Sequence, residues 1–344
     1  VKIVKSKCAT IILNWNGSAD TIACIKSIID NRVEQTDLII IDNNSAYEQY
    51  KKLREYISDI SVVETFANPS FPNDAEVEIS GLYQKETQNI YLIRMTTNYG
   101  FSKACNAGAF LAEQLGYKYI LFLNNDTEVT ENFLQSLIGD LDEKSDVFAV
   151  IPQIRYFYNK NKIWNCGGNI NNYGNRKYLH ANADCRNISD NVKKININFA
   201  TGCCILFRTN EFLSIGMFTE KFFFGEEDIE LALRLKSLNK KMLCDMGSII
   251  YHKVGASISG DQSKLLRKAY IHYLNRLVNM KSYLGSKWFI WMIPSIVKIM
   301  FNIIRLNKVS ARQFFKFTTA IVLDAYKSES VDKAKFEKIL RNGF

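Results

Sequence analysis

Amide and carboxylate side chains follow an apolar run near the middle of the chain. The five residues 119–123 are apolar or aromatic, and Asn124, Asn125 and Asp126 come directly after them. A run of this kind is typical of a strand buried on both faces of a parallel α/β sheet, and such sheets bind ligands at the carboxyl ends of their strands. An aspartate in this place can hold a divalent cation that bridges a diphosphate. The alternative is an Asx turn that caps the next helix, and the run alone does not separate the two.

A second acidic group stands at the predicted start of a helix. Glu226, Glu227, Asp228 and Glu230 put four carboxylates into five positions. Crowding of like charges raises the proton affinity of the least solvated carboxylate, which is what a general base requires. The alternative is an acidic first turn that complements the helix dipole and pairs with Arg234.

Two earlier strands, predicted at 9–13 and 38–41 with helical spacing between them, form a βαβ unit. Each strand ends in polar side chains that suit hydrogen bonding to a nucleobase and a ribose. The unit lacks the GxGxxG pattern of dinucleotide sites, so it does not predict a dinucleotide cofactor. Helix capping is the alternative for the aspartate. These strand-end residues are Asn14, Asn16, Asp42 and Asn43.

A third strand, predicted at 90–95, precedes a helix that starts at Ser102. The first turn of that helix offers free N–H groups to an anion, and Lys103 beside it favours a phosphate neighbour over plain packing on the sheet. His252 ends a strand predicted at 248–251. Neutral imidazole is a common metal ligand, although structural histidines are commoner.

Length and composition indicate a packed globular chain of one large or two unequal domains, with 344 residues of which 47% are hydrophobic. The eight cysteines are scattered without a CxxC, which favours buried free thiols in a reducing compartment. The amino end shows no signal-peptide pattern, so we expect a cytosolic protein.

The positive charge is concentrated at the carboxyl end. Residues 260–344 contain 16 Lys and Arg against five Asp and Glu, a net charge of +11, so residues 1–259 carry −2. A nucleic-acid enzyme would be expected to line its working cleft with this charge, whereas here it lies apart from the residues that could do chemistry. We therefore expect no nucleic-acid partner.

The basic tail also contains amphipathic segments. From Trp288 to Arg305 the polar residues form one narrow stripe on a helix of Trp, Ile, Met, Val and Phe, and Phe314–Tyr326 repeats the theme. With about eighteen residues interrupted by Pro294 and Lys298, the first segment is a poor membrane span. We expect residues 285–326 to lie on an anionic membrane surface; packing on the catalytic domain or a homodimer is the alternative.

The order of the motifs is more specific than any one of them. The series ILNWNG, IIIDNNS, NYGFSKACNAG, LFLNNDT, TGCCILF, FFFGEEDIELALRL and YHKVGAS resembles the family-2 inverting glycosyltransferases of the GT-A fold. It is most similar to the bacterial branch of rhamnosyl-, glucosyl- and galactosyltransferases that assemble surface polysaccharides, and the resemblance covers roughly residues 8–280. It implies an α/β, Rossmann-like, mostly parallel sheet flanked by helices over residues 1–260, with a nucleotide-sugar half at 1–130 and an acceptor half at 131–260. Residues 261–344 would be a basic, amphipathic helical extension.

The resemblance implies transfer of a sugar from UDP-hexose or dTDP-rhamnose to a hydroxyl of a glycan or lipid-linked saccharide, in O-antigen or capsule synthesis, with Mg²⁺ or Mn²⁺. This work would take place on the inner face of the plasma membrane. The base would be Asp228, and the metal ligands would be Asp126 and His252. Donor contacts are assigned to Asn14, Asn16, Asp42, Asn43, Asn98, Gly100, Phe101, Lys103, Asn106 and Asn125. The acceptor side or its support is assigned to Glu227, Gly202 and Arg234, and Tyr273, Asn275 and Arg276 look like the family's tyrosine and RN segment.

The sequence departs from the family at the first position of the DxD-like motif, which is Asn124, so one carboxylate faces the cation. Two other readings stay open. A sugar-phosphate nucleotidyltransferase would need a Gly-rich loop with Arg and Lys near the start, and residues 14–20 have neither. A non-catalytic, membrane-associated nucleotide-sugar-binding or scaffold protein would lack activity altogether.

Overall fold

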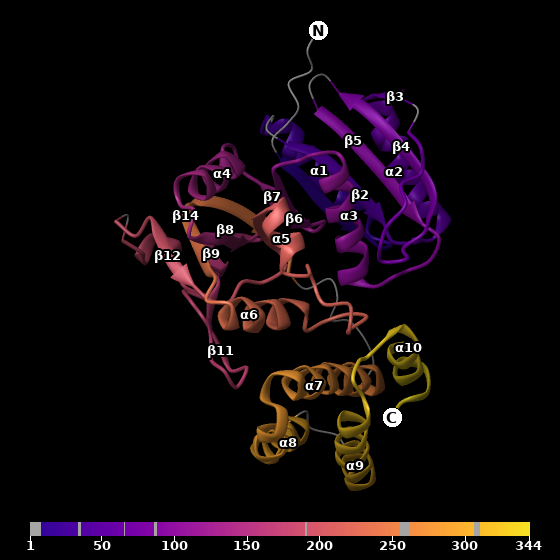
Figure 1. Cartoon of the computed structure of the whole chain (residues 1–344), viewed down its shortest axis with the longest axis vertical. Helices are drawn as coiled ribbons and strands as arrows, with labels where there is room; N and C mark the ends of the chain where they lie inside the picture. Colours follow the sequence, from indigo (N-terminus) through magenta and orange to yellow (C-terminus); the bar gives the residue numbers. More distant parts are fainter. Residues whose placement is uncertain are drawn as a thin grey trace.

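The computed structural model describes residues 8–33, 36–64, 66–85, 88–189, 191–254, 262–305 and 310–344. A large mixed sheet with helices on both faces forms the upper part of the molecule, and four helices form the lower part (Figure 1). The first half contains β1 (Cys8–Asn14), α1 (Ser18–Asp30), β2 (Thr36–Asp42), α2 (Tyr47–Asp59), β3 (Val62–Glu64), β4 (Val77–Lys85), β5 (Gln88–Met95), α3 (Phe101–Gln114), β6 (Tyr119–Asn124), β7 (Thr127–Val129) and α4 (Phe133–Glu143).

The second half of the sheet region contains β8 (Val147–Tyr156), β9 (Asn159–Asn165), β10 (Gly168–Ile170), β11 (Arg176–Tyr178), a 3₁₀ turn at Cys185–Asn187, β12 (Lys194–Ile197), β13 (Cys204–Arg208), α5 (Thr209–Ser214), α6 (Glu227–Ser237) and β14 (Lys241–His252). The C-terminal helical region contains α7 (Gln262–Leu284), a 3₁₀ turn at Gly285–Lys287, α8 (Trp288–Arg305), α9 (Ala311–Lys327) and α10 (Lys333–Asn342). Gly255, Ala256 and Ser257 of the last motif lie outside the described residues.

The centre of the sheet is parallel, in the order β6-β1-β2-β5. The pairing places Asn14 beside Asp42, and Leu13 beside both Ile41 and Asn124. The carboxyl ends of these strands therefore meet at one edge, as the sequence predicted. The helices of the βαβ crossovers cover both faces of this centre.

The sheet as a whole is mixed rather than mostly parallel. β13 runs antiparallel to both β6 and β8, and β12 runs antiparallel to β14. Beyond the centre, β8 and β14 pair in parallel. Between β3 and β5 lies the nine-residue strand β4, which pairs antiparallel with β5 and extends the sheet.

The core lies on both faces of the sheet. On β6, Ile120 and Phe122 enter one hydrophobic cluster, while Tyr119, Leu121 and Leu123 enter another. This alternation is the strand period of two, and it explains why the whole run is apolar. All eight cysteines are free thiols, and all but Cys185 are buried, as predicted.

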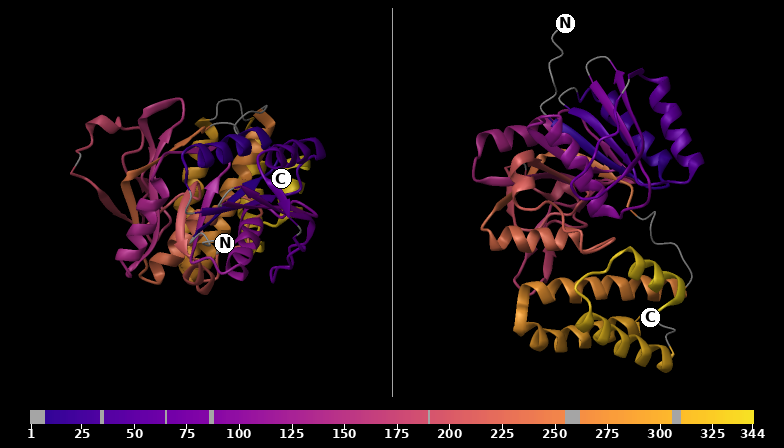
Figure 2. Two further views of the ribbon diagram at one scale, coloured as in Figure 1. Left: turned by 90° about the horizontal axis from the view of Figure 1, so that it is seen from above. Right: turned by 45° about the vertical axis from the view of Figure 1, so that its right-hand side comes forward.

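The C-terminal helical region shares a third hydrophobic cluster with the sheet region. Phe199, Phe222 and Ile229 from the sheet region pack with Tyr270 and Leu274 of α7. In both views α7 lies directly beneath α6, and α8 and α9 lie on the far side of α7 (Figures 1 and 2). One described stretch, Lys264–Arg305, is long and apolar enough to cross a membrane by length and composition alone.

Candidate active site

A buried hydrogen-bond network fixes the loops at the carboxyl ends of β1 and β2. The Asn14 amide donates to Asp42 Oδ1 at 2.7 Å and to Ser45 Oγ at 3.1 Å, and Thr21 Oγ1 donates to Asn14 Oδ1 at 2.8 Å. Asn14 and Asp42 have no exposed surface. These bonds shape the loops at the strand ends, and the predicted donor role of the two residues stays a prediction.

A second network joins the β2 end to the loop before α3. Asn43 Nδ2 donates to Asn98 Oδ1 and to the Gly100 carbonyl, each at 3.0 Å, and Asn43 Oδ1 accepts from the Tyr99 N–H at 2.9 Å. Asn98 Oδ1 also accepts from the Gly100 N–H. The predicted donor residues Asn43, Asn98 and Gly100 therefore form one unit.

The exposed members of the predicted donor set surround this edge. Asn16 is exposed, and its Oδ1 accepts from the Ala46 N–H at 2.8 Å. Asn125 Nδ2 donates to Thr21 Oγ1 at 3.0 Å, which ties the β6 end to α1. Beside Asn16, Trp15 is 58% exposed, a flat aromatic surface to which the sequence analysis assigned no role.

The side chains of Lys103 and Asn106 on α3 differ in what they contact. The Lys103 ammonium lies 5.0 Å from the centre of the Tyr99 ring, at the helix start where an anion was predicted. Asn106 is buried, and its amide donates to the Phe218 carbonyl and to Glu220 Oε1, each at 2.9 Å. Asn106 therefore connects α3 to the loop before α6, and its predicted role as a donor contact stays a prediction.

Gly100 allows two segments to meet in the middle of the site. Its φ of 81° and ψ of −176° are open only to glycine, and a Cβ at this position would lie 2.2 Å from the Phe223 carbonyl oxygen. The same carbonyl accepts from the Phe101 N–H at 3.1 Å. The donor-side loop and the acidic segment are thus in direct backbone contact.

Asp126 and His252 form the predicted pair at the end of the central strands. Asp126 Oδ1 lies 3.1 Å from His252 Nε2, because β14 pairs with β7 and brings the end of β14 beside the turn after β6. The Asp126 side chain is 23% exposed, so the carboxylate can be reached from solvent. Among the described residues, His252 Nδ1 is buried without a hydrogen-bond partner.

The chemistry of this pair fits a divalent cation held jointly with a substrate. The carboxylate oxygen suits Mg²⁺ or Mn²⁺, and neutral imidazole is a common metal ligand; Mg²⁺ usually takes one or two carboxylates and completes its shell with water and phosphate oxygens. Within the described ranges, no group of three or more His, Cys, Asp or Glu side chains is placed to hold a metal. The pair alone supplies at most two protein ligands, so the remaining ligands of a cation would come from water and the substrate.

The acidic segment before α6 is held by arginines from two other elements. Glu226 is buried, has a left-handed backbone with φ of 78°, and pairs with Arg276 of α7 at 2.7 Å. Arg176, at the start of β11, lies within electrostatic range of both Glu226 and Asp228. A non-glycine residue in this backbone region stores strain, which is common at functional sites.

These surroundings separate the acids by proton affinity. Burial raises the pKa of Glu226 to about 7, against the opposing effect of Arg276. Burial also raises the pKa of Glu227 and Asp228. For Glu227 the charge of Asp228 adds to the rise, whereas Arg176 and Arg276 oppose it for Asp228. The arginines therefore favour Asp228 over Glu227 as the group that carries the negative charge.

Short contacts connect the Asp126 turn to the acidic segment. The Asn124 N–H donates to the Cys203 carbonyl at 2.8 Å. The next residue back, Gly202, lies against the Phe101 ring, with 3.7 Å from its Cβ position to Phe101 Cζ. Phe101 in turn contacts Phe223, five residues before Asp228, so a series of contacts connects the turn at Asp126 to the segment that precedes Asp228.

Arg234 is not part of that series of contacts. Its guanidinium pairs with Glu230 at 2.8 Å and donates to the carbonyls of Ile215 and Met217. All its donors are engaged in holding the loop before α6. These contacts support the loop before α6, and the predicted role of Arg234 at the acceptor side or in its support stays a prediction.

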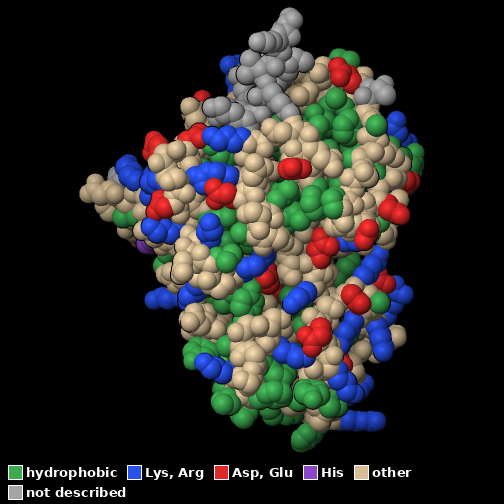
Figure 3. Space-filling model, viewed as in Figure 1, with side chains coloured by type: hydrophobic (Ala, Val, Ile, Leu, Met, Phe, Trp, Pro, Cys, Tyr) green, Lys and Arg blue, Asp and Glu red, His purple; other side chains and the backbone are tan. Residues whose placement is uncertain are grey.

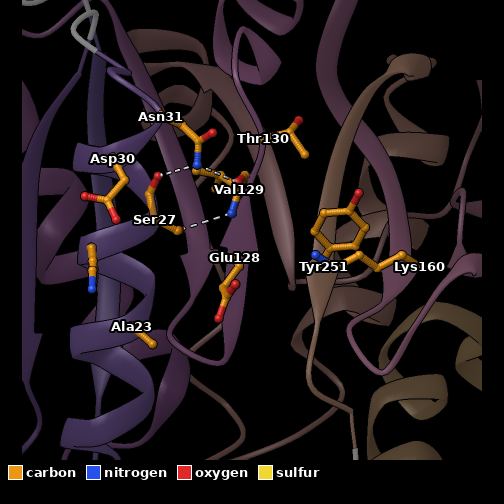
Figure 4. Close-up of a pocket in the computed structure, with 10 residues that line it drawn as sticks. Ala23, Ser27, Asp30, Asn31, Glu128, Val129, Thr130, Lys160 and Tyr251 are labelled. Atoms are coloured by element: carbon orange, nitrogen blue, oxygen red, sulfur yellow. Dashed lines mark hydrogen bonds between the residues drawn. The ribbon is translucent and has the colours of Figure 1, made fainter.

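A surface pocket lies beside the paired strands β7 and β14. It encloses about 410 Å³ and is lined by residues of α1, β7, β9 and β14, among them Glu128, Lys160 and Tyr251 (Figure 4). Tyr251 and His252 are neighbours on one strand, so their side chains point to opposite faces. The pocket thus lies behind the ladder that carries His252.

The fold and the site define a class of protein. A mixed α/β sheet with polar residues at the ends of its parallel strands, an Asp and His pair at that edge and an acidic helix start beside it are features of GT-A enzymes. Residues 69–213 match the family model described as Glycosyl transferase family 2. This match covers less than half of the chain, and the predicted GT-A fold is confirmed.

Two solved structures illustrate the likeness in fold. The crystal structure of GalNAc-T7 with UDP, GalNAc and Mn²⁺ superposes with a TM-score of 0.53 at 15% identity, covering 92% of this chain and 57% of that chain. The mannosyltransferase PcManGT from Pyrobaculum calidifontis, in complex with GDP-Man and Mn²⁺, superposes with a TM-score of 0.50 at 12% identity, covering 95% of this chain and 88% of that chain. This chain therefore spans little more than half of the GalNAc-T7 chain. No curated protein matches the sequence.

Proposed function

We propose that the chain is an inverting, metal-dependent glycosyltransferase that moves a sugar from a nucleoside diphosphate to a hydroxyl group. The observation that carries the proposal is the contact between Phe101 and Phe223, which joins the donor-side loop to the acidic segment. Through this contact a site for a diphosphate at Asp126 is connected to the segment that precedes a base at Asp228. The match of residues 69–213 to the model of glycosyl transferase family 2 supports the same reaction class.

In the proposed reaction Asp228 acts as general base. Its carboxylate takes the proton of the acceptor hydroxyl while that oxygen attacks the anomeric carbon. The bond from this carbon to the diphosphate oxygen breaks, and its electron pair leaves with the nucleoside diphosphate. One displacement inverts the anomeric centre, and no second carboxyl is needed to protonate the leaving group, unlike in a glycosidase.

The residues around Asp228 support this assignment. Arg176 and Arg276 lower its pKa against the effect of burial, so they favour the ionised form that a base requires. Glu227 has a raised pKa and no arginine among its principal influences, so it would hold its proton at higher pH. Glu227 is then a neutral neighbour that can donate a hydrogen bond to the acceptor or to Asp228.

Asp126 and His252 are the residues that would hold the cation. A bound Mg²⁺ or Mn²⁺ would stabilise the charge that grows on the leaving diphosphate. Both of the solved relatives described above contain Mn²⁺ and a nucleotide, which supports Mn²⁺ as the first ion to test.

For the donor we propose a UDP-hexose or dTDP-rhamnose, and for the acceptor a glycan or lipid-linked saccharide of a cell-surface polysaccharide. Trp15, exposed beside Asn16, offers a surface on which a base can stack. The donor identity can be tested by thermal denaturation with UDP-, dTDP- and GDP-sugars, with and without Mn²⁺. A matching donor raises the melting temperature only together with the cation.

The function is tested by nucleotide release with Asp228→Asn. We expect this variant to keep the donor-induced thermal shift and to lose transfer by roughly 10²–10⁴-fold, because it lacks only the base. Asp146→Asn is the matched control, since Asp146 forms a surface ion pair with Lys241 at 2.6 Å. Full activity of Asp228→Asn would refute the assignment.

The runner-up is a nucleotide-sugar-binding protein without activity. Such a protein would show the thermal shift with no nucleotide release from either the native chain or the Asp228→Asn variant. The anomeric configuration of the product, measured by NMR, checks inversion separately.

A further inference from the structure

The outer side of α8 is a continuous apolar stripe. Its members follow one another at intervals of three or four residues and are 54–75% exposed. This is the spacing of one helix face. The opposite side of α8 is anchored, with Trp288, Ile299 and Ile303 buried against the other C-terminal helices. The stripe consists of Ile290, Ile293, Val297, Phe301 and Ile304.

The neighbouring helix α9 extends this face. Phe315, Leu323 and Tyr326 of α9 are also more than half exposed, and the rings of Phe289 and Tyr326 lie 6.3 Å apart across the two helices. Figure 3 shows hydrophobic side chains gathered at the lower end of the molecule, where Figure 1 labels α8 and α9. The two stripes therefore merge into one apolar surface.

The helices that carry this surface cannot cross a membrane as one rod. The Trp288 indole N–H donates to the Leu277 carbonyl at 2.9 Å, although residues eleven positions apart in a continuous helix are separated by about 16 Å. The chain thus folds back between α7 and α8 (Figure 2). α7 is buried against the sheet region through Tyr270 and Leu274, so a spanning arrangement would require dismantling that core.

Cations border the apolar surface. The six exposed basic residues on α8, α9 and the turn before them have no ion-pair partner among the described residues. The α8 sequence contains no acid, and the one acid of α9, Asp324, accepts from Tyr270 at 2.8 Å and lies 3.6 Å from Lys335. The surface is therefore both apolar and uncompensated in charge. These residues are Lys287, Lys298, Arg305, Arg312, Lys316 and Lys327.

We propose that the outer face of α8 and α9 docks on an anionic lipid bilayer, with both helices lying in the interface. Apolar side chains would enter the boundary of the acyl chains while the lysines and arginines contact anionic headgroups. A second copy of this chain is a poorer occupant, because a two-fold contact through this face would bring the same cations opposite one another. The inference does not depend on the reaction proposed above.

The test is flotation of the full chain with lipid vesicles. Phosphatidylcholine vesicles are compared with vesicles that also contain phosphatidylglycerol, at low and at high salt. We expect binding to the anionic vesicles that weakens with salt. The double variant Lys298→Gln and Arg305→Gln should bind on the order of 25-fold more weakly, at roughly five-fold for each charge removed. No binding of the native chain to anionic vesicles would overturn the proposal.

The apolar contribution is tested with Val297→Glu and Phe301→Glu together. We expect this variant to lose vesicle binding while it keeps the melting temperature of the native chain, since both side chains are exposed. Val62→Glu is the matched control, because Val62 is 70% exposed on the edge strand β3. Undiminished binding by the α8 variant, or a native dimer in light scattering that this variant breaks, would assign the face to something other than a bilayer.

Discussion

The sheet region and the C-terminal helical region use apolar side chains in opposite ways. In β6, Leu121 and Phe122 face different sides of the sheet and both are buried. In α8, Ile293 and Val297 lie on the same side of the helix and both are exposed. A strand that is packed on both faces holds the residues at its end in place. A helix that is packed on one face leaves its other face exposed to solvent. The first region is thus suited to holding a site and the second to meeting a surface.

Polar side chains show the same contrast. Asn14 and Asp42 are fully buried and bond to each other, so they stiffen the loops around the site. On α8 and α9, cations such as Lys298 and Arg312 are exposed without ion-pair partners among the described residues. Buried polar networks specify one arrangement, while exposed charge acts on partners through long-range attraction.

The two regions meet at the segment that precedes Asp228. The Phe223 N–H donates to the Val331 carbonyl, and the Val331 N–H donates to the Lys221 carbonyl, both at 2.8 Å. Arg276 of α7 pairs with Glu226 in the same segment. The last strand of the sheet, β14, ends at His252 and α7 begins at Gln262, but the acidic segment is supported by both regions.

The largest effect is expected from a change confined to the sheet region. Asp126→Asn removes the single carboxylate of the proposed cation site and should lower sugar transfer by on the order of 100-fold or more, because such a cation contributes several kcal/mol of charge stabilisation. Initial rates over a range of Mn²⁺ concentrations measure the loss of sugar transfer. A chelator should abolish the activity of the native chain. Vesicle binding should not change, since the docking face belongs to the other region.

Glu128→Gln is the control for Asp126→Asn. Glu128 lies two residues further along, lines the pocket behind the β7–β14 ladder and is 3.8 Å from Lys253. It should leave the Mn²⁺ dependence unchanged. An equal loss of activity in both variants would mean that the turn, rather than the carboxylate, is what matters.

A smaller effect is expected where the two regions meet. Gly100→Ala places a Cβ against the Phe223 carbonyl and forces an alanine into a backbone region reserved for glycine, at a cost of about 1–3 kcal/mol before any shift of Phe223 is counted. Urea unfolding measures the loss of stability, and transfer should fall with it because the acidic segment moves. Gly139→Ala, in the interior of α4 with open space at its Cβ position, should instead stabilise by about 0.5–1 kcal/mol. Similar melting behaviour of the two variants would contradict the close approach at Gly100.

The sequence was sufficient to predict the centre of the fold. Runs such as 38–41 and 119–123 are apolar throughout because both faces of their strands are buried, and each run ends in Asn or Asp where the strand leaves the sheet. The βαβ order then places those ends at one edge. The direction of the antiparallel strands β4 and β13 was harder to predict, because it depends on how the strands are connected rather than on the local sequence pattern.

The candidate site was predictable only in part. Sequence indicates that Asn14, Asp42 and Asn106 are polar residues near strand or helix ends, but it does not indicate whether they face a cavity or a neighbouring loop, and here they face loops. Arg176 lies in an Asn- and Gly-rich region with no pattern of its own. Its nearness to Asp228 arises because the β10–β11 hairpin reaches α6, which is a tertiary effect.

The smallest and most discriminating effect is expected from Arg276→Gln in the C-terminal helical region. Arg276 lowers the pKa of both Glu226 and Asp228, so its loss raises both values. Sugar transfer should then be reduced most at low pH, because more of the base Asp228 is protonated there.

The free energy of unfolding should be reduced most at high pH, by about 1–3 kcal/mol, because Glu226 is ionised above its pKa of about 7 and would be buried without its partner. Rate profiles and urea unfolding across the same pH range, with Arg276→Lys as the variant that keeps the charge, measure the two trends. A merely structural arginine would make activity follow stability, whereas opposite pH trends would show that the helical region tunes the acids of the site.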